Sequence, residues 1–473
     1  MKLLQMILAG FLFVCLIGCT NHQSSGSTKS GQANTINISA VTDAPDSFPA
    51  GKIINNVVCK DDTTQSYSLY ISSFNKTNAV IYFFDPHADG ALPLKKYKAL
   101  ADEYNFILIG SNNSKNGNDW QTTETIWQTL FNDTRSRLQF NTNRIYTCGF
   151  SGGAKVASYI AMHHNEVKAV IANGAGLPDE ATVGNFNFSF TAVAGKGDMN
   201  MTGLVAVNNE LDKTKTKHRI IFFNGKHEWA PETTMRIGFA GLQFDAMRNK
   251  LVAKNDSFIN TYINSSKKRI DSSVNKNNWI QASNECMLSI NMLDGLTDVS
   301  WFKEKNNAII NNTAYKNQLQ QQQQLFSIEQ NKKAEFNAHF QQADMNYWNK
   351  TINDLYEKSK ASTAEAAMYQ RLLAYLSLAF YSISNQLINN NQNNEAAYFV
   401  TLYKMADSAN SEAWYFSAIL DARNNNAKAV NDDLLKAVSD GFNDTNRMLQ
   451  QPEFQNLKSE IDFASIEKKM KLN

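Results

Sequence analysis

Between about residues 50 and 255, apolar runs alternate with stretches whose apolar positions recur at helical spacing. Near-continuous apolar runs such as Val80–Phe84 are typical of strands buried on both faces of a sheet. The expected strands are Ile53–Cys59, Tyr67–Ile71, Ala79–Phe84, Phe106–Gly110, Arg144–Gly149, Ala169–Asn173, Phe188–Ala194 and Arg219–Phe223. The expected helices are Leu94–Tyr104, Thr122–Leu138, Gly153–His163 and Pro231–Leu251. This alternation predicts an α/β fold with a mostly parallel sheet, helices on both faces, and an antiparallel edge hairpin made by the first two strands.

The pattern changes after about residue 256, where strand signals disappear and Asn and Gln become frequent. The glutamine run Gln320–Gln324 is expected on the solvated face of a helix. Further helices are expected at Ala364–Ile388, Glu395–Ala406, Glu412–Ala422 and Ala427–Ser439. Small residues at Ala397, Ala413 and Ala418 are expected where these helices cross closely, so the region resembles tetratricopeptide-type helical hairpins.

The first residues have the pattern of an export signal. A basic start, Met1-Lys2, precedes an apolar run that ends in Leu16-Ile17-Gly18-Cys19. This ending resembles the lipobox of bacterial lipoproteins, which implies a diacylated Cys19 at the mature N-terminus and attachment to a membrane through lipid. The neutral residues after Cys19 favour the outer membrane, with the body facing the periplasm. The alternative is an ordinary secretory signal with a chance cysteine.

These features predict five parts of the chain. The parts are a signal peptide at 1–18, a flexible tether at 19–48, an α/β domain at 49–255, a helical linker region at 256–363 and a tetratricopeptide-like helical domain at 364–473. Cys15 would leave with the signal. Cys59, Cys148 and Cys286 would remain in an oxidising compartment, where at most one disulfide can form, and the sequence does not choose the pair.

Composition and charge exclude some classes of protein. Hydrophobic residues make up 43% of the chain and aromatic residues 11%, which is too much for a disordered protein. The 46 basic and 44 acidic residues nearly cancel, so no basic field indicates a nucleic-acid partner. No H-E-x-x-H, C-x-x-C or Walker-type motif occurs, and neither a metal nor a cofactor is expected.

The sharpest chemical signal is Gly149-Phe150-Ser151-Gly152-Gly153, which follows an expected strand and opens an expected helix. Small flanking residues permit a tight strand-to-helix turn, and the strained serine then projects its hydroxyl above the carboxyl edge of the sheet. We therefore expect Ser151 to be a nucleophile, and the alternative is a structural turn.

A nucleophilic serine needs a base, and elimination among the seven histidines leaves His227. His22 is in the tether, His163 and His164 end the helix after the turn, His218 opens a strand at the wrong end, and His339 lies beyond the domain. His227 follows the last expected strand, whereas His87 precedes the serine. The acid is expected at Asp198, just past the preceding strand, with Asp179 and Asp212 as alternatives.

Ester chemistry also needs donors to a developing oxyanion. We expect one from the backbone N–H of Gly152 and a second from that of Ala88, in the loop after Ala79–Phe84. His87 would neighbour or orient that donor. Asn113, Trp120 and Trp229 are further candidates for substrate contact, although tryptophans are more often part of a core.

At these residues, over roughly 50–255, the chain resembles the α/β-hydrolase superfamily, and within it secreted esterases of the polyhydroxybutyrate-depolymerase and feruloyl-esterase type. The resemblance implies a Ser151–His227–Asp198 triad acting on a small or polymeric ester. The usual His-Gly pair of the oxyanion loop is replaced here by Pro86-His87-Ala88. This departure puts the second oxyanion donor in doubt.

Three hypotheses follow from the sequence. The first is a lipid-anchored serine hydrolase, most simply a carboxylesterase, that uses an acyl-enzyme. The second is a catalytically idle hydrolase fold that serves as a scaffold, whose C-terminal helices bind a protein or peptide. The third is a peptidase similar to prolyl oligopeptidases, although the chain lacks their large N-terminal propeller.

Overall fold

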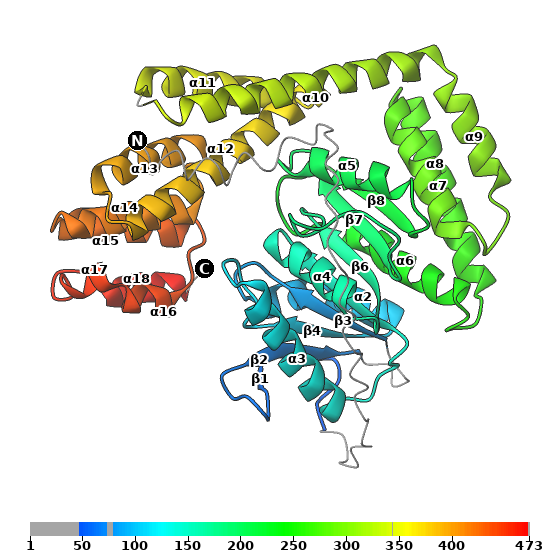
Figure 1. Cartoon of the computed structure of the whole chain (residues 1–473), viewed down its shortest axis with the longest axis horizontal. Coiled ribbons are helices and arrows are strands. Elements are labelled where there is room, and N and C mark those ends of the chain that lie inside the picture. The colour runs from blue at the N-terminus through cyan, green and yellow to red at the C-terminus, as the bar shows by residue number, and fades with distance from the viewer. Residues whose placement is uncertain (1–46, 73–78, 343, 472–473) are drawn as a thin grey trace, which may run out of the picture. The chain divides into compact units, whose positions relative to one another are not determined.

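The computed structural model describes residues 47–72, 79–342 and 344–471, and in that part of the chain eight strands form one sheet (Figure 1). The strands are β1 (Ile53–Val58), β2 (Ser66–Ile71), β3 (Ala79–Phe84), β4 (Phe106–Ser111), β5 (Ile145–Phe150), β6 (Val167–Asn173), β7 (Ser189–Gly195) and β8 (His218–Phe223). Their order is β1-β2-β4-β3-β5-β6-β7-β8. β2 is antiparallel to β1 and β4, and the other neighbours are parallel. The predicted fold class and edge hairpin are confirmed.

Helices cover both faces of this sheet, with α2 packed beside α6 and α3 beside α4 (Figure 1). Their bounds are α2 (Ala91–Tyr104), α3 (Trp120–Arg137), α4 (Gly152–His163), α5 (Met201–Leu211) and α6 (Glu232–Arg248). The helix α5 was not predicted. It contains Gly203 and β-branched Val205 and Val207, which have low helix propensity, yet it buries Met201, Leu204 and Leu211. Tertiary burial therefore outweighs local preference there.

Three further helices share the core of the sheet region. They are α7 (Asp256–Asn275), α8 (Trp279–Leu293) and α9 (Ser300–Ile310). Apolar residues such as Tyr262, Met292 and Phe302 belong to one buried cluster with Phe239 and Phe244 of α6. The described residues accordingly divide within the next helix, α10 (Thr313–His339). One compact unit holds those up to Gly195 and Asn200–Gln318, and the other holds Lys196–Met199 and those from Leu319 onward. The expected linker at 256–363 is thus shared between two packed units.

The second unit is helical from α10 onward. Its helices are α10 (Thr313–His339), α11 (Met345–Ser359), α12 (Ala364–Asn389), α13 (Asn393–Ala406), α14 (Ser411–Arg423), α15 (Ala427–Ser439), α16 (Thr445–Gln450), α17 (Pro452–Gln455) and α18 (Phe463–Met470). All four helices expected after residue 363 are present. The glutamine run lies in α10 and is largely exposed, as predicted. Of the small residues, Ala413 and Ala418 are buried, but Ala397 is exposed and its neighbour Ala396 occupies the packed position. The resemblance to tetratricopeptide hairpins stays a prediction.

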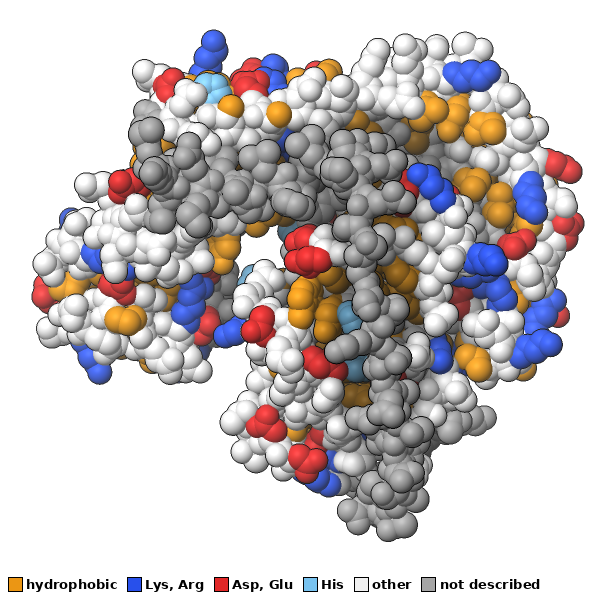
Figure 2. Space-filling model, in the orientation of Figure 1, with side chains coloured by type: hydrophobic (Ala, Val, Ile, Leu, Met, Phe, Trp, Pro, Cys, Tyr) orange, Lys and Arg blue, Asp and Glu red, His pale blue; other side chains and the backbone are white. Residues whose placement is uncertain are grey.

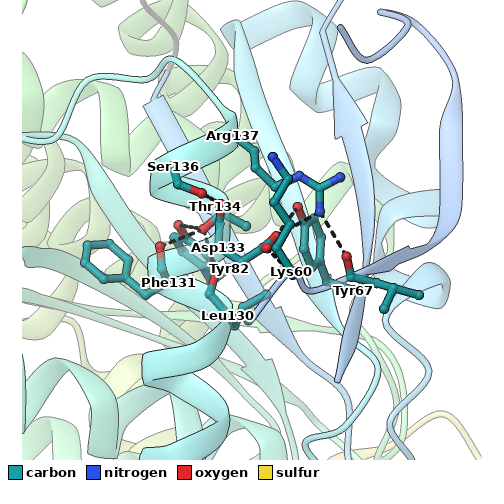
Figure 3. A network of polar contacts seen from close by, with 10 residues as sticks. Lys60, Tyr67, Tyr82, Leu130, Phe131, Asp133, Thr134, Ser136 and Arg137 are labelled. Atoms are coloured by element: carbon teal, nitrogen blue, oxygen red, sulfur yellow. Dashed lines mark hydrogen bonds and ion pairs between the residues drawn. The ribbon is translucent and has the colours of Figure 1, made fainter. Parts of the chain in front are cut away.

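A buried carboxylate ties the edge hairpin to α3 (Figure 3). Asp133 accepts hydrogen bonds from the backbone N–H of Lys60 at 2.7 Å, from the Tyr67 hydroxyl at 2.9 Å and from Arg137 Nη1 at 3.1 Å. Arg137 also donates to the carbonyl of Val58 at 2.9 Å. Burial and the nearby Asp133 raise the pKa of Tyr67, so its hydroxyl remains a donor. These polar groups satisfy one another and have a structural role.

The three cysteines of the described residues are all buried and free. Burial raises the pKa of Cys59 and of Cys286 to about 12, so neither thiol is a ready nucleophile.

Charged side chains of both signs are interspersed over the face drawn in Figure 2. None of the helices described is long and apolar enough to span a membrane. The predicted signal, the lipidated Cys19 and nearly all of the predicted tether lie outside the described residues.

Candidate active site

Ser151 lies at the sharp turn between β5 and α4, with φ 52° and ψ −124°. Backbone approaches on both sides leave no room for a side chain at the neighbouring glycines. A Cβ at Gly149 would lie 2.0 Å from the carbonyl oxygen of Gly153, and a Cβ at Gly153 would lie 1.9 Å from that of Phe84. Such a strained serine persists only where the surrounding packing holds it, and strain of this kind concentrates at functional sites.

The structure brings Ser151 and His227 together. Ser151 Oγ lies 2.9 Å from His227 Nε2, a hydrogen-bond distance for a nucleophile and its base. His227 comes from the loop after β8, 76 positions along the chain, and its ring packs on Phe150 at 4.7 Å between centroids. Both side chains are partly exposed, so a substrate can reach them. The helix α4 begins directly behind the serine, where its N-terminus favours negative charge.

Asn173, at the end of β6, connects Ser151 to the loop that carries His227. Its carbonyl accepts from the Ser151 N–H at 2.9 Å. Its side-chain amide donates to the Glu228 carbonyl at 2.9 Å and accepts from the Ala230 N–H at 3.2 Å. The side chain is fully buried, and these bonds use one donor and one acceptor site of its amide. Sequence reasoning missed this residue, although an asparagine closing an apolar strand is a usable signal.

Asp198 is buried and is the third residue after β7. The parallel neighbour of β7 is β8, with Gly195 opposite Phe223, so the acid and base loops leave the same edge of the sheet. A Cβ at Gly195 would lie 2.4 Å from the Lys226 carbonyl oxygen, which shows how closely the two loop starts approach. The two alternative acids lie elsewhere: Asp179 pairs with Lys155 at the surface, and Asp212 bonds His218 at 2.9 Å, at the start of β8.

The backbone N–H of Ala88, the expected second oxyanion donor, has a partner within its own loop. The Ala88 N–H donates to the Asp85 carbonyl at 3.2 Å and so closes a turn, with Ala88 at φ 61°. The His87 N–H donates to Asp85 Oδ1 at 2.9 Å, and Pro86 has no N–H. In this loop, where Pro86-His87-Ala88 replaces the usual His-Gly pair, the backbone N–H groups of His87 and Ala88 therefore bond Asp85 of the same loop.

A side chain from the next loop lies against the turn instead. A Cβ at Gly152 would lie 1.9 Å from Asn116 Oδ1 and 3.6 Å from Asn116 Nδ2, so the Asn116 amide covers this face of the residue after the nucleophile. The Asn116 N–H donates to the Pro86 carbonyl at 2.8 Å, which links the two loops. Sequence reasoning missed Asn116, although it named Asn113 in the same loop.

The other candidates for substrate contact divide into accessible and structural residues. The His87 side chain is 78% exposed, with Nδ1 3.3 Å from Asp85 Oδ1. Trp120 is partly buried and stacks on Tyr159 at 4.6 Å between centroids. Trp229 is a core residue, since it is 5% exposed and its indole N–H donates to Asp85 at 2.8 Å.

Asn113 is also structural. Its Oδ1 accepts from the Ser66 N–H at 2.8 Å, and its Nδ2 donates to the Thr64 carbonyl at 3.1 Å. Both ends of its amide are thus used to fix the start of β2. Both candidates thus have structural partners, since Asn113 bonds two backbone groups and Trp229 bonds the Asp85 carboxylate. Among the described residues, no group of three or more His, Cys, Asp or Glu is arranged to hold a metal ion.

No family description and no curated protein matches the sequence. Solved structures that are similar include an esterase of Pyrobaculum calidifontis, at 10% identity over 42% of this chain and 85% of that chain, with a TM-score of 0.34. Others are a dienelactone hydrolase-like promiscuous phosphotriesterase from metagenomic libraries (14% identity, 41% and 99%, TM-score 0.34) and a ferulic acid esterase (14%, 41% and 97%, TM-score 0.32). The chemistry of this chain therefore has to be argued from its own residues.

Proposed function

We propose that this protein is a serine hydrolase that cleaves carboxylic esters through an acyl-enzyme intermediate. The observation that carries the proposal is the 2.9 Å approach of Ser151 Oγ to His227 Nε2 at a strained strand-to-helix turn. A structural turn does not require a basic ring on the serine hydroxyl. A nucleophile does, because the hydroxyl must lose its proton as it attacks.

The reaction follows from these roles. Ser151 Oγ attacks the ester carbonyl carbon while His227 Nε2 takes the hydroxyl proton, and the carbonyl oxygen becomes an oxyanion. The tetrahedral intermediate then collapses, and His227 returns the proton to the departing alcohol. Water, activated by the same imidazole, hydrolyses the acyl-enzyme and releases the acid. We assign to Asp198 the role of orienting His227 and stabilising its protonated form.

For the oxyanion we propose two donors. The first is the backbone N–H of Gly152, at the start of α4, and the second is the side-chain amide of Asn116, which lies beside it. A side-chain amide can replace a backbone donor in this role. In this arrangement the Asn116 side chain supplies the second oxyanion donor, because the backbone N–H groups of His87 and Ala88 bond Asp85.

A fluorophosphonate probe on the purified mature chain, together with a panel of acyl-chain and aromatic esters, tests the proposal. We expect covalent labelling and hydrolysis by the natural protein and neither by Ser151→Ala. Ser136→Ala, which removes an exposed serine of α3, is the matched control and should label normally. Folded protein that neither labels nor hydrolyses any ester would overturn the proposal and leave the scaffold hypothesis.

We also propose that the chain is exported and anchored in the cell envelope through lipid on Cys19. The support is the basic start, the apolar run and the Leu-x-Gly-Cys ending in the sequence. In a bacterial host, the full chain should partition with membranes, and Cys19→Ser should move it to the soluble fraction. Cys15→Ser is the control and should leave the partition unchanged.

A further inference from the structure

The short loop that carries Asp198 is organised by helices far away in the sequence. Lys196–Met199 belongs to the same compact unit as Leu319–Asn473, whereas its neighbours Gly195 and Asn200 belong to the unit of the sheet. Gly197, Asp198 and Met199 are buried. The position of the proposed catalytic acid is thus set partly by contacts outside the sheet.

Two cationic side chains bond the two ends of this loop. Arg371 of α12 donates through Nη1 to the Lys196 carbonyl at 2.8 Å, and Lys333 of α10 lies with Nζ 3.4 Å from the Met199 carbonyl. These carbonyls bracket Asp198 along the chain. A loop held at both ends has few alternative conformations left, so the residue between the contacts is positioned as well.

A single buried carboxylate holds both cations. Glu329 Oε1 is 2.8 Å from Lys333 Nζ, and Glu329 Oε2 accepts from Arg371 Nε at 2.8 Å and lies 2.7 Å from Nη2. Glu329 is fully buried, and the Lys333 and Arg371 side chains are only 8% and 4% exposed. Burying three charges is unfavourable unless their hydrogen-bonding capacity is used. Arg371 engages Glu329 through Nε and Nη2, and its Nη1 is directed at the loop.

We propose that Glu329, Lys333 and Arg371 form a clamp, here called the acid-loop clamp, that positions Asp198 for catalysis. This inference rests on the proposed function of Asp198 as the triad acid. The three residues are positioning residues, because they act through the loop and do not reach the reacting atoms. The helical region is then a working part of the enzyme, and a partner that displaces α10 or α12 would alter the turnover rate.

The experiment compares Arg371→Met with a matched control in the full mature chain. Arg423 of α14 also makes a two-bonded pair with a glutamate, Glu453, and also donates to a carbonyl, that of Ile388. Arg423→Met therefore removes the same kind of interaction without touching the loop. Arg371→Lys, which keeps the charge, serves as the conservative variant and as the fallback if Arg371→Met does not fold.

We expect Arg371→Met to lower kcat by about 10- to 100-fold with KM within about twofold, as for a displaced catalytic group. Arg371→Lys should recover part of this loss, and Arg423→Met should change kcat by less than about threefold. In an Asp198→Asn background, Arg371→Met should have almost no further effect, because residues that act as a unit are not additive. Equal losses in both backgrounds, or equal losses for Arg371→Met and Arg423→Met, would overturn the clamp.

Hydrogen exchange separates the failure of the clamp from the failure of the proposed function. In Arg371→Met the amides of Gly197–Met199 should exchange at least about tenfold faster than in the natural chain, while those of β7 stay protected. Unchanged exchange would overturn the clamp even in an active enzyme. If the natural chain neither hydrolyses esters nor labels, the catalytic proposal fails, and faster exchange still establishes the clamp as a structural device.

Discussion

Among the described residues, positive φ outside glycine only follows helix ends in the helical unit, whereas in the sheet unit it also occurs at Ser151, in the turn between β5 and α4. In the helical unit, positive φ occurs outside glycine at Asn391 and Asn425, both at 55°, directly after α12 and α14. Asparagine tolerates this left-handed geometry. At both positions it follows the end of a helix, where a left-handed residue is common. In the sheet unit, Ser151 has φ 52° with ψ −124°, outside the left-handed helical region. Positive φ at an asparagine thus marks a turn, whereas at Ser151 it marks stored strain that aims a hydroxyl.

The first prediction concerns Asp198 and His227, the proposed acid and base that act with the strained Ser151. We expect Asp198→Asn and His227→Ala each to lower kcat by about 10⁴-fold, because the nucleophile then lacks an oriented base. Steady-state kinetics on the best ester of the panel measure this. Asp212→Asn is the matched control, since this exposed carboxylate bonds His218 at the opposite edge. A loss under about tenfold for Asp198→Asn would remove it from the triad.

The second prediction concerns the substitute oxyanion donor. Removing one good donor lowers kcat by about 10²- to 10³-fold, and we expect this of Asn116→Ala with little change in KM. Asn116→Asp should be worse, because a carboxylate repels the oxyanion. Asn143→Ala, at an exposed position before β5, is the control. Full activity in Asn116→Ala would mean that the second donor comes from elsewhere.

The third prediction tests the close backbone contacts that impose the turn. Gly149→Ala and Gly153→Ala each place a Cβ within about 2 Å of a carbonyl oxygen, and backbone cannot move aside as a flexible side chain can. We expect each to lower the free energy of unfolding by about 2–3 kcal/mol in urea titrations. Gly184→Ala is the control, because a Cβ there has no atom within 4 Å. Equal stability of all three variants would refute the tight turn.

The fourth prediction separates stored strain from turn chemistry directly. Ser151→Gly should raise the free energy of unfolding by about 1 kcal/mol while abolishing activity, since glycine adopts this backbone without strain. Asn425→Gly should change stability by under about 0.5 kcal/mol and leave activity intact, whereas Asn425→Ala should destabilise by about 1 kcal/mol. Thermal unfolding and ester hydrolysis measure both. A destabilised Ser151→Gly would show that the serine geometry is not strained.

The smallest effect concerns pH and a histidine outside the site. Burial alone would lower the pKa of His164, but hydrogen bonds that its ring donates to the carboxylates of Glu166 and Glu124 outweigh burial and raise the pKa above 6.5. A raised folded-state pKa adds stability below pH 6.5 that is lost as pH rises through the folded value. We expect this loss to be under about 1 kcal/mol and to disappear in His164→Gln, by urea titration at several pH values. His163→Gln is the control and should keep the dependence.

Much of the fold could be predicted because strands carry a local signal. Apolar runs punctuated by polar turns located every strand of the described sheet to within two residues, and the asparagine-rich turns located the later helices. The helix α5 was missed because its own residues favour helix weakly, and burial of Met201 and Leu204 decides its state. The packing of α7–α9 with the sheet was not predicted for a similar reason, since burial shared with α6 leaves no mark on composition.

The sequence by itself determined which residues are candidates for the chemistry, because a glycine-flanked serine and the elimination of other histidines are properties of the chain. Only the tertiary structure decided which polar groups are already engaged: the Ala88 N–H closes a turn, Trp229 packs in the core, and Asn173 joins the nucleophile to the base loop. The physical reason is distance along the chain. A motif acts through neighbouring residues, whereas satisfaction of a buried donor or acceptor depends on segments that meet only after folding.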